Sequence, residues 1–160
     1  MFPIEDPKFI TDLELKFFRQ ELVEFLAYWN AKRGARPFPN RKDIVPREIE
    51  KLLPWINMYD ILDGGKEFRI RLVGTALSDA LGGGDYRGKP ISEMPQLLSK
   101  RIQRGIDLVL ENRAPLRTYA VESAIPGQDF QGNESCLAPL STNGTDIDVI
   151  IVVAILQNRK

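Results

Sequence analysis

Histidine is absent from this 160-residue chain, and cysteine occurs once, at Cys136. Without histidine the chain lacks the side chain whose ordinary pKa lies nearest neutrality, which argues against Ser-His and Cys-His catalysis, histidine-ligated haem and most zinc sites. A lone cysteine forms no internal disulfide, so nothing in the composition calls for an oxidising compartment. The composition therefore favours a cytoplasmic protein and makes catalysis less expected.

Long apolar runs, an export signal and net charge are lacking as well. No stretch approaches the roughly 20 consecutive apolar residues of a membrane span, and the N-terminal MFPIEDPKF has no basic start followed by an apolar run. Lys plus Arg and Asp plus Glu number 22 each, so no long-range field attracts nucleic acid or an anionic membrane. The basic segment 32–51 is expected to be a solvated connection. Neither nucleic acid nor a membrane is expected as a partner.

Apolar residues at spacings of three and four predict an amphipathic N-terminal helix over 12–33, with Thr11 as its cap and Gly34 at its end. Burial of such a stripe is worth several kcal/mol, at roughly 25 cal/mol per Å² of apolar surface. The stripe must be buried on the chain's own sheet or on a second copy, and we expect a share of both. The candidate interface residues are Leu15, Phe18, Leu22, Phe25 and Trp29.

The rest of the chain predicts strands around a helical middle. A hairpin is expected over 55–74, a second helix over 97–112, and strands over 116–124, 131–140 and 147–157. The last strand is apolar on both faces, so the middle helices should cover one face and the N-terminal helix the other. This order favours an α+β domain with a five-stranded antiparallel sheet, divided into an N-terminal helical segment (1–34) and a main domain (35–160).

Two arginines stand out in the second strand, where EFRIRLVGTAL alternates apolar and basic residues. In the favoured interpretation Arg69 and Arg71 are half-exposed and pair with acidic neighbours such as Asp60. In the other, Arg71 lies near Thr75 and grips a carboxylate or phosphate, and Gly74 lets the ligand approach the backbone. Burial of Arg71 beside a cavity would separate the two interpretations.

The glycine-rich stretch GGGDYRGK, from Gly82 on, does not fit a phosphate-binding loop. Pro90 follows its lysine where serine or threonine would bind magnesium. A flexible connection is the favoured interpretation, and a lid with Tyr86 as its closing ring is the functional one. The candidate ligand-binding residues are Arg71, Thr75, Tyr86 and Tyr119.

Three segments together resemble a known family: RGARPFPNRKDIVPREIEKLLPWINMYDIL, FRIRLVGTAL and GGGDYRGKPISEM. With the order of elements, they are similar to PAS domains, and most of all to the near-single-domain PAS proteins common in alphaproteobacteria, over about residues 28–156. The resemblance implies a five-stranded antiparallel sheet that cradles a helical belt, with a cavity between them for a small ligand. It also implies a sensory or regulatory interaction domain, often dimeric through an N-terminal helix, with no chemistry of its own.

We therefore expect a signalling sensor that forms a homodimer and binds a small ligand, a signalling protein partner, or both. Its cofactor is unknown, because there is no haem or flavin signature: GNESCLAPL around Cys136 does not resemble the flavin-reactive cysteine motif of light-sensing relatives. The alternatives are a small pocketed enzyme or binding protein that uses carboxylates, and a ligand-free structural adaptor. A polar-lined cavity favours the receptor, paired buried acids favour the enzyme, and a packed interior favours the adaptor.

Overall fold

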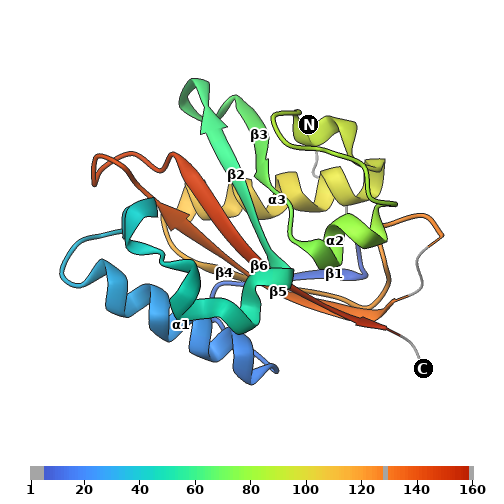
Figure 1. Cartoon of the computed structure of the whole chain (residues 1–160), viewed down its shortest axis with the longest axis horizontal. Coiled ribbons are helices and arrows are strands. Elements are labelled where there is room, and N and C mark those ends of the chain that lie inside the picture. Colours follow the sequence, from blue (N-terminus) through green and yellow to red (C-terminus); the bar gives the residue numbers. More distant parts are fainter. Residues whose placement is uncertain (1–5, 128–129, 159–160) are drawn as a thin grey trace.

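The computed structural model of the chain describes residues 6–127 and 130–158, which form an α+β domain (Figure 1). Six antiparallel strands make one sheet in the order β1-β4-β5-β6-β2-β3. The strands are β1 (Phe9–Asp12), β2 (Ile56–Leu62), β3 (Glu67–Leu72), β4 (Leu116–Ala120), β5 (Phe130–Leu140) and β6 (Val149–Asn158). The helices are α1 (Gln20–Arg33), α2 (Thr75–Ala80) and α3 (Gln96–Asn112), with 3₁₀ turns η1 (Arg41–Asp43), η2 (Pro46–Trp55), η3 (Asp63–Gly65) and η4 (Ile91–Glu93).

The predicted fold class and antiparallel sheet are confirmed, but the start of the first helix is wrong. The helix begins at Gln20, and Thr11, expected as its cap, lies in the additional edge strand β1. The carboxylate of Asp12 accepts hydrogen bonds from the backbone N–H groups of Glu14 (2.8 Å) and Lys16 (2.9 Å). Leu15 has a positive φ of 59°. This side-chain turn competes with helix formation and separates strand from helix.

Strands β5 and β6 are covered on both faces, as the apolar sequence of β6 predicts. Leu137 faces α3, because a Cβ added to Gly105 of that helix would lie 2.8 Å from its side chain. Its neighbour Cys136 points the other way, toward the side on which α1 packs (Figure 1). From α1, the indole Nε1 of Trp29 donates a hydrogen bond to the carbonyl of Pro139 (2.9 Å). The N-terminal helix therefore belongs to the same core as the sheet.

A buried carboxylate fixes the point where the chain enters α1. Glu134 of β5, only 2% exposed, accepts hydrogen bonds from the backbone N–H groups of Phe18 (2.8 Å) and Arg19 (2.9 Å). It also accepts one from Nε of Arg117 on β4 (2.7 Å), and that guanidinium lies 3.5 Å from Asp12. A buried charge is tolerated when several donors satisfy it in this way. The network ties β1, β4, β5 and the start of α1 together.

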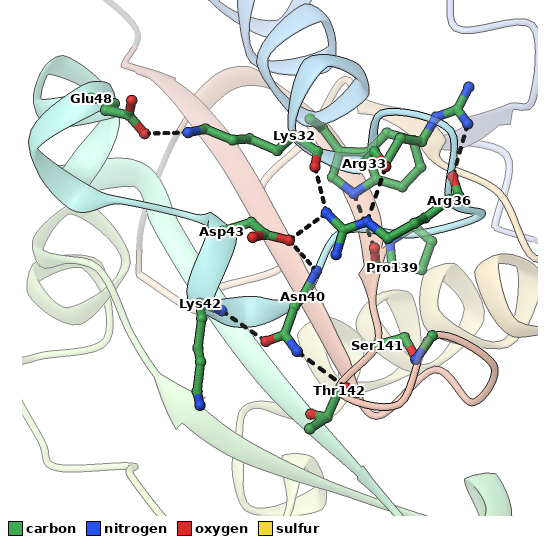
Figure 2. Close-up of polar contacts among 12 residues, drawn as sticks. Lys32, Arg33, Arg36, Asn40, Lys42, Asp43, Glu48, Pro139, Ser141 and Thr142 are labelled. Carbon is green, nitrogen blue, oxygen red and sulfur yellow. Dashed lines mark hydrogen bonds and ion pairs between the residues drawn. The ribbon is translucent and has the colours of Figure 1, made fainter.

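The proline-rich connection after α1 is an organised clamp (Figure 2). Oδ2 of Asp43 accepts hydrogen bonds from the guanidinium of Arg36 (2.7 Å) and from the backbone N–H of Asn40 (2.8 Å). The amide of Asn40 in turn donates to the carbonyl of Thr142 in the β5–β6 loop (3.1 Å). The segment that carries much of the family resemblance is therefore structural: it joins the end of α1 to the far end of the sheet.

Gly74 allows two backbone segments to touch. A Cβ at this position would lie 2.5 Å from the carbonyl oxygen of Pro54 and 2.7 Å from that of Ile56. Its N–H donates to the buried side chain of Asn57 (2.9 Å). The glycine of the VGT motif thus serves close packing of β3 and α2 against the start of β2.

We expect Gly74→Ala to destabilise the protein by about 1–3 kcal/mol, because backbone carbonyls cannot move aside as a flexible side chain can. Gly84→Ala is the matched control, since a Cβ there would be in ordinary contact with Tyr86 at 3.5 Å. Urea denaturation of both variants measures the effect. Equal stability of the two variants would contradict the close-packing role of Gly74.

Candidate functional site

A cavity of about 80 Å³ lies between the sheet and the N-terminal half of α3. From the helix it is lined by Leu98, Arg101 and Ile102. The opposing wall comes from four neighbouring strands, and its residues include Asn57, Tyr59, Thr118, Ala120, Asn133, Ser135, Leu137, Val152, Ala154 and Leu156. Since a water molecule needs roughly 10–15 Å³ of such space, the cavity has room for several waters or one small ligand.

The cavity lies beside a close contact between α3 and the sheet. At Gly105 the helix is in close contact with Leu137, because glycine carries no side chain to hold them apart. Toward the N-terminus of α3, the facing sheet positions carry short side chains that cannot fill the same space. In the sheet register these positions are adjacent: Thr118 pairs with Ser135, and Ser135 pairs with Ala154. Local side-chain volume therefore creates the space.

The cavity wall is mostly apolar with a few buried polar groups. Thr118 and Ser135 are buried on adjacent strands, and the buried Asn57 holds the backbone of Gly74 through its side-chain oxygen. Tyr59 is also buried, and burial raises the pKa of its hydroxyl well above the usual value, so it stays protonated. A few polar groups in an apolar wall orient a small ligand.

Arg101 is the one charged side chain that lines the cavity in the described part of the chain. Only 7% of its side chain is exposed. Its Nε donates to Oδ2 of Asp6 (2.7 Å), its Nη2 to the other oxygen of that carboxylate (3.4 Å), and its Nη1 to the backbone carbonyl of Glu122 (2.8 Å). The guanidinium also lies 5.5 Å from the ring centre of Phe9, another residue of the lining.

The four predicted ligand-binding residues are not among those that line the cavity. Arg71, 38% exposed, pairs with Asp60 (2.8 Å), and Arg69 pairs with Glu67 (2.8 Å), so the favoured interpretation of the two arginines is confirmed. Thr75 is exposed at the start of α2. A ligand-binding role of Arg71 or Thr75 stays a prediction.

The two predicted tyrosines lie in different surroundings. Tyr86 is half-buried in the glycine-rich connection, which is held to β3 through hydrogen bonds from the N–H of Gly88 to the carbonyl of Ile70 (2.7 Å) and from the N–H of Ile70 to the carbonyl of Lys89 (2.9 Å). Tyr119 lies on β4, and its ring makes an edge contact with that of Phe18 (5.3 Å) on the α1 side of the sheet. The functional roles predicted for both remain predictions.

The candidate interface residues divide into two groups. Leu22, Phe25 and Trp29 are buried in the chain's own core. Leu15 is partly buried, and Phe18 is 75% exposed. Of the predicted stripe, Phe18 therefore offers the largest free apolar surface.

Cys136 is a buried thiol on the α1 side of β5, and it does not line the cavity. Desolvation, with a smaller contribution from the charge of Glu134, raises its pKa well above the usual value. This fits the inert thiol predicted from the sequence.

Among the described residues no cluster of three or more Cys, Asp or Glu side chains is placed to hold a metal ion. Within residues 6–127 and 130–158, no helix has the length and apolar content needed to cross a bilayer.

The sequence did carry a signal for Arg101 that the prediction missed. Leu98 and Ile102 belong to the predicted apolar stripe of the second helix, and Arg101 stands between them at helical spacing. A charge on the inward side of a helix needs a partner or a ligand. The short side chains at alternating positions of the facing strands would have supported the prediction of a ligand site beside Arg101.

Comparisons with known proteins identify the family of the chain. The model of the PAS domain family matches residues 18–153, and the chain belongs to this family. An RNA-binding light-oxygen-voltage receptor is similar in structure at 13% identity and a TM-score of 0.45, over 72% of this chain and 34% of the receptor, so the chain spans about a third of that protein. A light-oxygen-voltage domain studied with a flavin analogue has the same identity and TM-score, over 71% of this chain and 84% of that domain. No curated protein matches significantly in sequence.

Family membership supports a broad sensory or regulatory role. The match begins at residue 18, so it includes α1 and leaves β1 outside. Asp6, which pairs with Arg101, and Phe9, which lines the cavity, thus lie outside the family-matched part of the chain.

The ion pair between Asp6 and Arg101 predicts a pH-dependent contribution to stability. The hydrogen bond from Arg101 is the largest cause that lowers the pKa of Asp6 below 3.8, its ordinary value. The ionised form is thus favoured in the folded state, so its stabilisation is complete above the ordinary pKa and is lost as pH falls through the lower folded pKa. Asp6→Asn should therefore be about 1 kcal/mol less stable than the parent at about pH 6, and this gap should close toward about pH 2. Urea denaturation across this range measures the gap, and a gap independent of pH would contradict the ion pair.

Proposed function

We propose that this chain is a sensory domain that binds a small molecule in the cavity under α3 and reports its presence to a protein partner, without catalysing a reaction. The observation that carries the proposal is the cavity itself, with an apolar wall, a few buried hydroxyl and amide groups, and the guanidinium of Arg101. A site of this composition suits recognition of a small, partly apolar molecule with one polar end.

The two alternatives receive less support from the same region. A structural adaptor would be expected to fill the space between sheet and helix, because an unfilled cavity costs stability. A carboxylate-based enzyme would be expected to line it with acids, whereas the lining within the described residues contains neither aspartate nor glutamate. A receptor accounts for both features.

We propose that an apolar patch, formed by Ile10, Phe18 and Tyr119, is the surface through which the domain contacts its protein partner and passes on the signal. Ile10 lies opposite Tyr119 in the pairing of β1 with β4, and the ring of Phe18 packs against that of Tyr119. Ile10 and Phe18 are exposed. The same strands present Phe9, Thr118 and Ala120 to the cavity, so a ligand that shifts β1 or β4 would also move the patch.

We propose a second copy of the chain as the occupant of this patch, in the cytoplasm. With a formal net charge of zero, two copies do not repel each other strongly. Phe18 supplies a large exposed ring of the kind that anchors protein interfaces.

Native mass spectrometry of the purified protein should detect a retained small molecule or one acquired from an added mixture of metabolites. Ala154→Leu should abolish this binding, because the added carbon atoms occupy the cavity against which Ala154 lies. Ala27→Leu, at an exposed position of α1, is the matched control and should bind as the parent does. A folded Ala154→Leu variant that still binds the same molecule would rule out the cavity as the site.

Phe18→Ser should weaken the homodimer by roughly tenfold or more, as expected when an interface anchor is removed. Val45→Ser is the control, because Val45 is exposed but lies outside the patch. Analytical ultracentrifugation over a range of concentrations measures the dissociation constants. The proposed contact would be wrong if the two variants dissociated alike.

A further inference from the structure

The N-terminal segment places a carboxylate on Arg101, the charged residue of the cavity lining within the described part of the chain. Asp6 contacts the guanidinium of Arg101 through both carboxylate oxygens, at 2.7 Å and 3.4 Å. Only 7% of the Arg101 side chain is exposed, against 24% for Asp6. The acidic partner thus lies on the solvent side of the pair, and the arginine on the cavity side.

Asp6 is held by a short turn and not by the sheet. The turn closes with a hydrogen bond from the N–H of Phe9 to the carbonyl of Asp6 (3.0 Å), and β1 begins only at Phe9. Lys8 makes an exposed ion pair with Glu122, of a kind that contributes little. Opening this turn would free Arg101 while the pairing of β1 with β4 stays intact.

We propose that the cavity takes a small aliphatic carboxylate, whose carboxylate group replaces that of Asp6 on Arg101. This rests on the proposed function, in which the cavity is the ligand site. The aliphatic part would lie against Leu98, Ile102 and Leu156, which line the same space. At about 80 Å³ the cavity limits that part to a few carbon atoms.

The exchange keeps the charge of the site balanced. A buried guanidinium without a partner is strongly unfavourable, so a neutral ligand cannot displace Asp6 without leaving Arg101 unpaired. A carboxylate restores both the charge and the bidentate hydrogen bonds. The third donor, Nη1, remains on the carbonyl of Glu122 throughout and keeps the side chain oriented. The site therefore selects an acid over its amide.

Asp6 in this arrangement is an internal competitor of the ligand. Binding would release the turn at residues 6–8 and leave the side chain of Phe9 free to shift beside the cavity, while its backbone stays paired with β4. Ligand binding is thereby coupled to β1, which carries Ile10 of the proposed output patch on its other face.

Isothermal titration calorimetry of the full chain with butyrate and with butyramide tests the inference. Butyrate should bind, and butyramide should bind at least about tenfold more weakly. Arg101→Gln should reduce butyrate affinity by roughly tenfold or more, because a charge-assisted hydrogen-bond pair is lost. Arg104→Gln is the control on the same helix, since Arg104 is exposed and does not line the cavity, and it should leave the affinity unchanged.

Asp6→Asn gives a readout that a purely structural role would not produce. Removing the competing charge should tighten butyrate binding by roughly threefold or more, although the same substitution lowers stability. If circular dichroism shows that Arg101→Gln does not fold, Asp6→Asn and the comparison of butyrate with butyramide still test the proposed carboxylate site. Unchanged or weaker binding to Asp6→Asn would overturn the inference.

The failure of this inference can be told apart from failure of the proposed function. Butyramide binding as tight as butyrate, with no dependence on Arg101, would overturn the carboxylate assignment and leave the cavity as a receptor site. Absence of binding by both probes, together with no molecule bound in native mass spectrometry, would overturn both.

Discussion

The structure depends on burial of both faces of its two central strands. Strands β5 and β6 carry apolar side chains on each side, and neither face can be left to water. Helix α1 covers one face and α3 the other, so the N-terminal helix is part of the core (Figure 1). The clamp around Asp43 and the buried carboxylate of Glu134 fix the two ends of α1 to the sheet. Because Leu22, Phe25 and Trp29 of α1 are buried in the core, little of the apolar stripe of this helix is exposed to a partner.

The second covered face holds the cavity. At Gly105, α3 packs closely against Leu137. Nearer the N-terminus of the helix, short side chains on the facing strands leave a cavity. Into this apolar space the fold places a guanidinium, which is costly unless it is paired. The present pair uses an acidic residue from the N-terminal segment, outside the part matched by the family. In the described part of the chain, Arg101 is the one charged side chain of the cavity lining, and its partner Asp6 lies on the solvent side of the ion pair.

Much of the fold could be predicted from the sequence. The second helix, expected over 97–112, is found at Gln96–Asn112 because its apolar spacing is long and periodic. The last three strands overlap the expected segments, although β4 ends at Ala120 and not at residue 124. The start of α1 could not be predicted, since the hydrogen bonds of Asp12 and four residue pairs with β4 outweigh a helical pattern. The family resemblance implied a cavity between sheet and helices, but the residues that line it could not be predicted. The lining depends on strand register, which brings Thr118, Ser135 and Ala154 side by side only in the folded sheet.

The central claim is that a small molecule enters the space between α3 and the sheet. Methyl-labelled NMR during a titration with butyrate tests this directly, because the two covered faces carry different methyl groups. The account predicts concentration-dependent shifts of the Leu98 and Ile102 methyls, with those of Leu22 and Ile151 unmoved. Shifts confined to the α1 side, or none at either face, would contradict it.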